Sequence, residues 1–304
     1  MTATVEVFEA ERGRLTGLAY RMLGELHEAQ DVVQDAWVRW SGSSTDVLDP
    51  PAWLTRVVVN LCRTRLTSLR VRRTEYVGPW LPEPVPTGPG GPDLGPCETV
   101  EQRESLSLGV LRLLESLTPG ERAVFVLHEA FGHPHAEVAL LLDLEEATVR
   151  QHLHRARERV GAGRPRFEVD VEAARRLLAR FLDAAAGNDV AALEQLLAHD
   201  VEAVSDGGGL VSAARRPVEG RERVARFVAG LARQATAATF EVAEVNGTVA
   251  VLVFVAGDGA QRSSTRPERV LVVVMQAEFD AATGELVRLC AQLNPGKLAA
   301  AGGS

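Results

Sequence analysis

Apolar residues recur at helical spacing through the first half of the chain and at strand-like spacing through most of its last third. In the first part, apolar positions that repeat every three or four residues predict helices at about 8–23, 27–40 and 51–69. Gly24 and the polar stretch 41–46 interrupt this pattern. The chain is therefore expected to begin with a compact all-helical unit.

A stretch rich in proline and glycine, 79–96, follows the first helical unit. Its prolines remove backbone donors and its glycines add chain entropy, so it cannot form a regular helix or an interior strand. This composition predicts a linker.

A second helical unit is predicted after the linker. Thr118-Pro119-Gly120-Glu121 has the capping hydroxyl, N1 proline and N3 glutamate of a helix start. Helices at about 119–129, 135–142 and 145–160, with a short joint at Asp143, are typical of a helix-turn-helix.

The last helix of this unit has two unlike faces. Val149, Leu153, Ala156 and Val160 form an apolar stripe that must be buried against another helix. The opposite face is polar and consists of Gln151, His154, Arg155 and Glu158. Arginine pairs phosphates or forks onto guanine, and glutamine bonds adenine, so this face suits duplex DNA. A structural three-helix bundle with a solvated arginine face is the alternative.

The chain from about residue 171 onward is predicted to form an α+β domain. Valine-rich runs between turn residues, with Asn246-Gly247 as a strong hairpin signal, indicate a curved antiparallel sheet backed by helices. The expected strands lie at about 201–204, 240–245, 249–255, 270–279 and 286–293, and the helices at about 171–186, 190–198 and 220–234.

Length and composition are those of a multidomain globular protein. The chain has 304 residues, of which 46% are hydrophobic, and a net charge of −8. An acidic chain does not coat nucleic acid indiscriminately, so any DNA contact is expected to be local. One basic stretch without any acid runs from Trp53 to Arg73. Its arginines are Arg56, Arg63, Arg65, Arg70, Arg72 and Arg73.

Cysteine usage and hydropathy favour a soluble protein of a reducing compartment. Cys62, Cys97 and Cys290 have no metal-ligand spacing and predict neither a disulfide framework nor a zinc knuckle. The N-terminus lacks the pattern of a secretory signal, and the longest apolar runs, such as 249–256, are too short to span a bilayer. We therefore expect a cytoplasmic protein without membrane contact.

The order of these parts resembles that of a bacterial extracytoplasmic-function (ECF) RNA polymerase sigma factor, over about residues 8–160. The resemblance implies two all-α domains: residues 1–76 as sigma region 2, and 98–162 as the helix-turn-helix of region 4, joined by a linker over 77–97. It implies promoter-specific transcription initiation with core RNA polymerase, and it implies neither an enzyme nor a cofactor.

Residues 31–37 (DVVQDAW) are similar to the family's segment that docks on the clamp helices of the polymerase largest subunit. By this resemblance the polymerase contacts are Asp31, Gln34, Asp35 and Trp37. The polymerase flap is a further expected partner surface. A solvated helix face is the alternative for residues 31–37.

Two further segments are similar to the family's promoter-reading helices. The first segment begins at Trp53 and continues into the arginine-rich stretch. In it the resemblance places Asn60 against a base flipped from the −10 element, and it gives Arg56 and Arg63 contacts to phosphates. Trp53 belongs either to this DNA surface or to the core. In the second, the expected contacts to the −35 element are Arg150, Gln151, His154 and Arg155.

Three short motifs narrow the resemblance to sigma factors with a fused SnoaL-like (NTF2-like) α+β cone domain, the SigJ-like group, here over 166–304. They are Trp80-Leu81-Pro82-Glu83-Pro84, Asp206-Gly207-Gly208-Gly209 and Asn294-Pro295-Gly296-Lys297-Leu298. Gly296 stands where the group usually has Asp, and Leu210 where it has Lys or a similar residue. The resemblance implies that this domain regulates the sigma portion in cis, in place of a separate anti-sigma factor. Our hypothesis is that it does so by packing on the first helical unit through the linker and the two motifs that contain glycine and proline.

Other interpretations stay open at this point. SnoaL-like folds include polyketide cyclases, which makes His199, Asp200 and Asp206 candidate catalytic residues, although helix ends and Asx turns explain them better. An apolar cavity that senses a ligand is a second interpretation. A helix-turn-helix regulator that binds operators without polymerase is a third. The histidines of the helix-turn-helix are not expected to hold zinc, since His152 and His154 diverge on their helix.

Overall fold

The computed structural model describes residues 2–42, 47–96, 99, 102, 105–163, 171–235, 237–256 and 269–301. The chain divides into two compact units. Unit 1 contains Met1–Glu75 and Pro89–Gly163, and unit 2 contains Tyr76–Gly88 and Arg164–Ser304. The proline-rich segment is thus shared, since its first half folds with unit 2 and its second half with unit 1.

Unit 1 begins with helices α1 (Thr2–Leu23), α2 (Leu26–Ser41) and α3 (Pro50–Thr74), which pack on one another. Gly24 ends α1 with a φ of 76°, a left-handed conformation that glycine adopts without strain. Asp49 caps α3 by accepting a hydrogen bond from the Ala52 N–H, and proline follows it. The predicted helices are confirmed, and each extends beyond its predicted limits.

The second part of unit 1 contains α5 (Leu108–Leu114), α6 (Pro119–Phe125), the π-helix η1 (Val126–Ala130), α7 (His135–Leu142) and α8 (Glu146–Gly163). The Thr118 hydroxyl and the Glu121 carboxylate form the predicted capping box at the start of α6. Asp143 takes a left-handed φ of 55° between α7 and α8, which ends one helix and redirects the chain into the next.

Unit 2 is built on a six-stranded sheet of order β2-β1-β6-β5-β4-β3. Its elements are α9 (Val171–Ala186), α10 (Val190–Leu196), β1 (Leu197–Asp206), β2 (Val218–Glu219), α11 (Arg221–Gln234), β3 (Thr239–Val245), β4 (Thr248–Ala256), β5 (Arg269–Phe279), β6 (Leu286–Gln292) and α12 (Pro295–Leu298). The prediction of a wholly antiparallel sheet was wrong at one place, because β1 pairs with β6 in parallel. A parallel pair needs a long crossover, and here the other strands and α11 lie between the two in sequence. The short elements β2 and α12 were not predicted.

The β3–β4 hairpin confirms its sequence signal. Asn246 and Gly247 have φ values of 53° and 70°, and Val245 pairs with Thr248 across them. This is the two-residue turn with both central residues at positive φ that matches the twist of paired strands.

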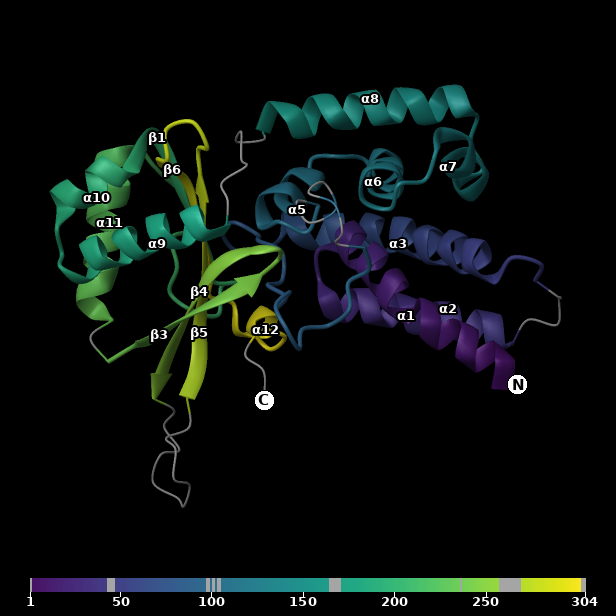
Figure 1. Cartoon of the computed structure of the whole chain (residues 1–304), viewed down its shortest axis with the longest axis horizontal. Coiled ribbons are helices and arrows are strands. Elements are labelled where there is room, and N and C mark those ends of the chain that lie inside the picture. The colour runs from purple at the N-terminus through teal and green to yellow at the C-terminus, as the bar shows by residue number, and fades with distance from the viewer. Residues whose placement is uncertain are drawn as a thin grey trace, which may run out of the picture. The chain divides into compact units, whose positions relative to one another are not determined.

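The sheet carries an apolar cluster on each face, and Figure 1 shows the helices that cover the two faces. Helices α9, α10 and α11 cover one face, where Phe181, Leu193, Val251 and Phe279 are buried together. On the other face, Val245, Leu252 and Val274 pack with Leu298 of α12.

No helix within the described ranges is both long enough and apolar enough to cross a membrane.

Candidate functional site

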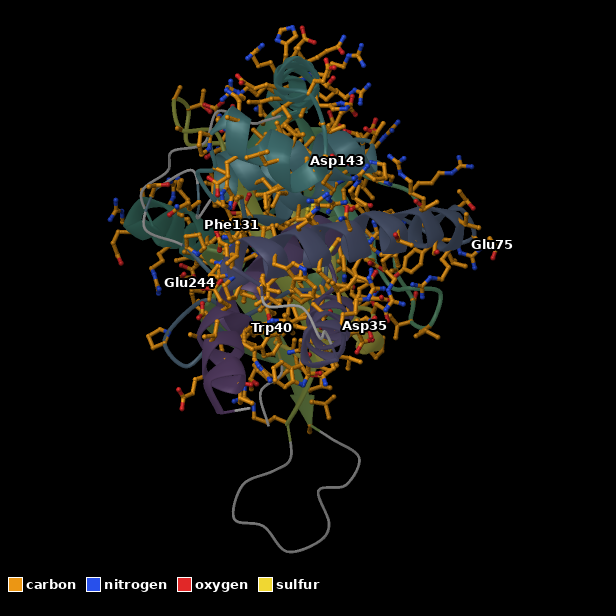
Figure 2. The ribbon with its side chains drawn as sticks, turned by 90° about the vertical axis from the view of Figure 1, so that its right-hand side faces the viewer. Asp35, Trp40, Glu75, Phe131, Asp143 and Glu244 are labelled. Atoms are coloured by element: carbon orange, nitrogen blue, oxygen red, sulfur yellow. The ribbon has the colours of Figure 1, made fainter. Side chains whose placement is uncertain are left out.

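Helix α8 presents one buried and one exposed face, as predicted. Val149, Leu153, Ala156 and Val160 are each at most 2% exposed. Arg150, Gln151, His154 and Arg155 are all exposed. Glu146 pairs with Arg150, and Glu158 lies 3.5 Å from His154. The side chains of α8 project outward in Figure 2, beyond the labelled Asp143.

On α2 the acidic residues that resemble a polymerase-docking segment lie at the surface. Asp31, Gln34 and Asp35 are exposed, and Figure 2 labels Asp35 and Trp40 on this helix. Trp37 is half-buried, with its ring centroid 4.8 Å from that of Phe8. This face of α2 therefore presents exposed polar side chains beside the half-buried Trp37 ring, which packs on Phe8.

Helix α3 exposes Arg56 and Asn60, while Trp53 and Arg63 are half-buried. The Arg63 guanidinium donates to Asn60 Oδ1 at 3.5 Å. These four residues lie between the start and the middle of α3, so the N-terminal part of the basic stretch is accessible to a partner.

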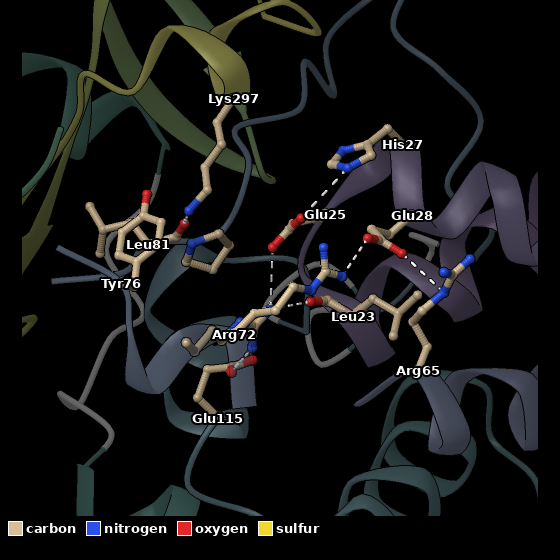
Figure 3. A network of polar contacts seen from close by, with 12 residues as sticks. Leu23, Glu25, His27, Glu28, Arg65, Arg72, Tyr76, Leu81, Glu115 and Lys297 are labelled. Carbon is tan, nitrogen blue, oxygen red and sulfur yellow. Dashed lines mark hydrogen bonds and ion pairs between the residues drawn. The ribbon is translucent and has the colours of Figure 1, made fainter. Parts of the chain in front are cut away.

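The rest of the basic stretch is engaged within unit 1. Arg65 and Arg72 lie 3.1 and 2.8 Å from the buried Glu28 carboxylate (Figure 3). Arg70 donates to the Leu117 carbonyl at 2.5 Å, and Arg73 pairs with Glu115. The acids that pair with these arginines come from α2 and from the segment after α5, which are far away in sequence. The acid-free stretch of α3 therefore does not form one continuous basic surface.

Burial lowers the pKa values of two arginines in unit 1 that pair with Glu115. Desolvation lowers the pKa of Arg73 to about 10. It also lowers the pKa of the fully buried Arg122 to about 9. Both groups pair with Glu115, which offsets the cost of removing their charge from water.

Within the described residues, Glu25, His27 and Glu28 form a cluster with metal-ligand geometry. Arg73 lies 3.5 Å from the Glu25 carboxylate, and Glu28 is paired with two arginines. A dense positive environment disfavours a cation, so this cluster is better explained as part of the ion-pair network in Figure 3.

In unit 2 the first half of the linker is held by a buried carboxylate. Asp206 is fully buried, and its oxygens accept from five donors. Two donors belong to the segment Tyr76–Gly88, which includes the first half of the linker: the Tyr76 hydroxyl at 2.6 Å and the Leu81 N–H at 2.9 Å. The others are the Lys297 ammonium at 2.8 Å, the Gln292 amide at 3.1 Å and the Gly208 N–H at 3.0 Å. We call this group the Asp206 clasp.

Lys297 reinforces the Asp206 clasp from α12. Its ammonium donates to the Leu81 carbonyl at 2.7 Å, and it lies 4.9 Å from the ring centroid of Tyr76 and 4.4 Å from that of Trp80. Cation–π and charge-assisted contacts of this kind are strengthened when water is excluded. Leu81, Pro82, Glu83 and Pro84 are buried on the same unit.

The glycines after Asp206 are required by close packing. Gly208 and Gly209 have φ values of 61° and 73°. A Cβ on Gly208 would lie 2.4 Å from the Asn294 amide nitrogen, which itself donates to the Tyr76 hydroxyl at 2.9 Å. A Cβ on Gly209 would lie 3.0 Å from Val77. Pro295 and Gly296 are exposed.

A second set of contacts holds the end of this linker half. The Val85 N–H donates to Asn246 Oδ1 at 3.2 Å, and the Asn246 N–H donates to the Val85 carbonyl at 2.9 Å. Thr87 accepts from the Gly247 N–H at 2.8 Å. Sequence patterns found the turn but could not assign it a partner, and Tyr76, Gln292 and Asn246 were all missed as linker contacts.

The candidates for catalysis do not form a site. His199 and Asp200 are exposed, and both oxygens of Asp206 are occupied by the linker and its neighbours. A hollow of about 150 Å³ lies beside Val77, Gly78, Gly207 and Arg215. Small-molecule sites usually exceed about 300 Å³, so this hollow gives no support to ligand sensing.

Comparison with known proteins identifies the two helical parts. Residues 7–72 match the family model Sigma-70 region 2, and residues 107–160 match Sigma-70, region 4. Helices α1–α3 and α5–α8 thus define a transcription initiation factor of the sigma-70 class.

Full-length relatives narrow this class. The chain is 39% identical over 247 residues to the ECF RNA polymerase sigma factor SigJ of Mycobacterium tuberculosis, which covers 80% of this chain and 78% of that protein. It is 32% identical over 253 residues to the probable ECF RNA polymerase sigma factor SigI of the same species, covering 82% and 83%. The crystal structure of Mycobacterium tuberculosis SigJ matches with a TM-score of 0.74 at 32% identity, over 97% of this chain and 98% of that one.

The chain belongs to the ECF family of RNA polymerase sigma factors. It is a non-enzymatic initiation factor that acts with core RNA polymerase at promoter DNA. The predicted family and the predicted fold class, two helical parts followed by an α+β domain, are confirmed. The interpretations as a polymerase-independent regulator and as an enzyme were wrong.

Proposed function

We propose that unit 2 regulates this sigma factor in cis by holding the first half of the linker. The observation that carries the proposal is the Asp206 clasp, in which a fully buried carboxylate accepts from both Tyr76 and Leu81. The linker joins the two promoter-binding regions, so its freedom sets how far apart they can move. A domain that grips it controls that freedom without touching DNA.

Binding surfaces for the established partners follow from exposure and chemistry. Asp31, Gln34 and Asp35 offer acidic and amide groups to the clamp helices of the polymerase largest subunit. Asn60 and Arg56 on α3 would read and hold the −10 element, and the exposed face of α8 the −35 element. Region 4 would also meet the polymerase flap.

Regulation by a domain of the same chain removes the need for a separate anti-sigma protein. We further propose that the protein acts in the cytoplasm, where core polymerase is found. The first statement depends on unit 2 having an effect on initiation, and the second follows from the family alone.

Run-off transcription with core polymerase tests the proposal. The full-length protein is compared with Asp206→Asn, which keeps the shape but removes the charge that binds Lys297 and the linker. We expect the rate of initiation to change by about 5-fold or more, the lower end of typical coupling between sites. Asp200→Asn, an exposed aspartate of the same strand, is the matched control. Equal initiation by the wild type and Asp206→Asn, with chymotrypsin cleavage after Trp80 increased in the variant, would reject regulation through the clasp.

A further inference from the structure

The second half of the linker lies on a stripe of α1 made by Gly13, Gly17 and Arg21. These residues are four apart and therefore share one face of the helix. A Cβ on Gly17 would lie 1.7 Å from the Leu94 carbonyl oxygen, and a Cβ on Gly13 would lie 2.0 Å from the Asp93 carboxylate. The linker backbone can approach α1 this closely only because no side chain stands at Gly17.

Arg21 continues the stripe with a fully buried guanidinium. It donates to the carbonyls of Leu94 at 2.6 Å, Pro96 at 3.1 Å and Gln102 at 3.3 Å, and to the Ser105 hydroxyl at 2.7 Å. Four acceptors, two from the linker and two from the residues after it, thus converge on one side chain. The described residues Asp93–Pro96 contain no helix or strand, so contacts of this kind fix their path.

Arg21 also connects regions 2 and 4. Its guanidinium lies 5.2 Å from the ring centroid of Phe131, and its carbonyl accepts from Arg122 at 3.3 Å. Beside it, Arg70 of α3 bonds the Leu117 carbonyl and Arg73 pairs with Glu115. Regions 2 and 4 are in direct contact within unit 1.

This contact conflicts with promoter binding. The −10 and −35 elements are about 25 base pairs apart by their names, or about 85 Å at 3.4 Å per base pair. Helices in contact with each other cannot lie on two sites so far apart. The regions must separate, and the linker that joins them must first leave α1.

We propose that the Gly13–Gly17–Arg21 stripe is an autoinhibitory lock, which holds the second half of the linker on region 2 until core polymerase releases it. The lock contains no residue of unit 2. It acts independently of the Asp206 clasp, and each can fail without the other.

The first test opens the lock with Gly17→Ala. The new methyl group meets the Leu94 backbone, which cannot swing aside, while alanine favours the helix itself. Gly230→Ala on α11 is the matched control, because its Cβ would meet nothing closer than the end of the Arg233 side chain at 4.0 Å. We expect faster chymotrypsin cleavage after the buried Leu94 and run-off initiation raised by about 3-fold or more at limiting core polymerase, with Gly230→Ala unchanged.

The second test closes the lock. Gly13→Cys with Asp93→Cys, in a Cys97→Ser background, places two Cβ atoms 2.8 Å apart. A shift of about 1 Å brings them to the Cβ separation of about 3.5–4.5 Å found in disulfides. Cys62 and Cys290 are buried. The crosslink leaves about 13 residues between the crosslinked position and region 4, or about 45 Å of extended chain. This is shorter than the separation of about 85 Å between the two promoter elements. We expect oxidation to lower initiation about 10-fold or more and reduction to restore it, with neither single-cysteine variant responding.

The outcomes separate the possibilities. Leu94 cleaved faster with initiation unchanged or lowered, or an oxidised crosslink that initiates as well as its reduced form, would overturn the lock. Leu94 staying protected in Gly17→Ala would show that the stripe does not hold the linker. None of these results depends on Asp206, so they leave the regulation by unit 2 to its own experiment.

Discussion

Asp206 and Lys297 form a buried ion pair in which the carboxylate Oδ2 lies 2.8 Å from the ammonium nitrogen. The two residues are 0% and 6% exposed. Both also bond to Leu81, one through its N–H and the other through its carbonyl. A linker residue thus completes the hydrogen bonding of an ion pair that would otherwise be costly to bury.

Removing one partner of this pair is expected to destabilise unit 2 more than replacing both. Asp206→Ala leaves a buried ammonium without its carboxylate and should cost about 3–5 kcal/mol in the free energy of unfolding. The double variant with Lys297→Met removes the unpaired ammonium and retains the packing on Tyr76 and Trp80. It should recover part of that loss, because the four other donors to Asp206 stay unsatisfied. Urea denaturation of the single and double variants measures the coupling. A double variant that is less stable than Asp206→Ala would show that the pair is not the source of the effect.

Gly208 should tolerate alanine much less well than another glycine with nearly the same backbone conformation. Gly208 and Gly284 have φ values of 61° and 69° in unit 2, so alanine costs each about 1–2 kcal/mol. Only at Gly208 does the new Cβ meet the Asn294 amide, at 2.4 Å, whereas at Gly284 the nearest atom is 3.9 Å away. We expect a larger loss of unfolding free energy for Gly208→Ala, together with faster proteolysis of the linker near Leu81. Equal effects at the two glycines would remove the steric argument.

Local signals in the sequence predicted local structure well. The apolar stripe of α8, the capping box at Thr118 and Glu121, and the Asn246-Gly247 hairpin were all confirmed. Each depends on residues within a few positions of one another, where helix and strand periodicity and turn conformation dominate.

Features that depend on distant partners could not be predicted. The basic stretch of α3 contains no acid, yet Glu28 of α2 reaches Arg72, and Glu115 of the segment after α5 reaches Arg73. Likewise, the parallel pairing of β1 with β6 joins strands from opposite ends of unit 2. Composition identified the linker but not its division between two units. Nothing in a proline-rich stretch indicates which surface will hold it.

Cys62 gives a pH dependence with a definite sign. Burial raises the pKa of its thiol above the ordinary value. As pH rises, the Cys62 thiol therefore loses its proton at a lower pH in the unfolded chain than in the folded protein. The contribution of the thiol to the free energy of unfolding is complete below about pH 8.5 and is lost as pH rises further. The unfolding free energy of the wild type minus that of Cys62→Ala should fall by about 1 kcal/mol between pH 9 and 10. The difference between the two proteins cancels the groups that do not interact with Cys62, while Arg122 is coupled to the thiol and contributes to the difference. A constant difference over this range would contradict the assignment.

Arg155 and Arg157 offer a comparison on one helix that tests promoter reading by α8. Both are exposed, but Arg157 is paired with Glu129 at 2.7 Å, and Arg155 lies beside the exposed Gln151 and His154 on the proposed DNA face. A base or phosphate contact should make Arg155→Ala cost about 1–3 kcal/mol in binding to the −35 element, while Arg157→Ala should cost much less. Run-off transcription from promoters that differ at single −35 positions measures this.

Gln151→Ala should relax the preference at one base pair rather than weaken all promoters equally, because an amide reads a base edge. Similar losses for Arg155→Ala and Arg157→Ala on every promoter would indicate that α8 contributes only general charge, and the assignment of its exposed face to sequence reading would then be wrong.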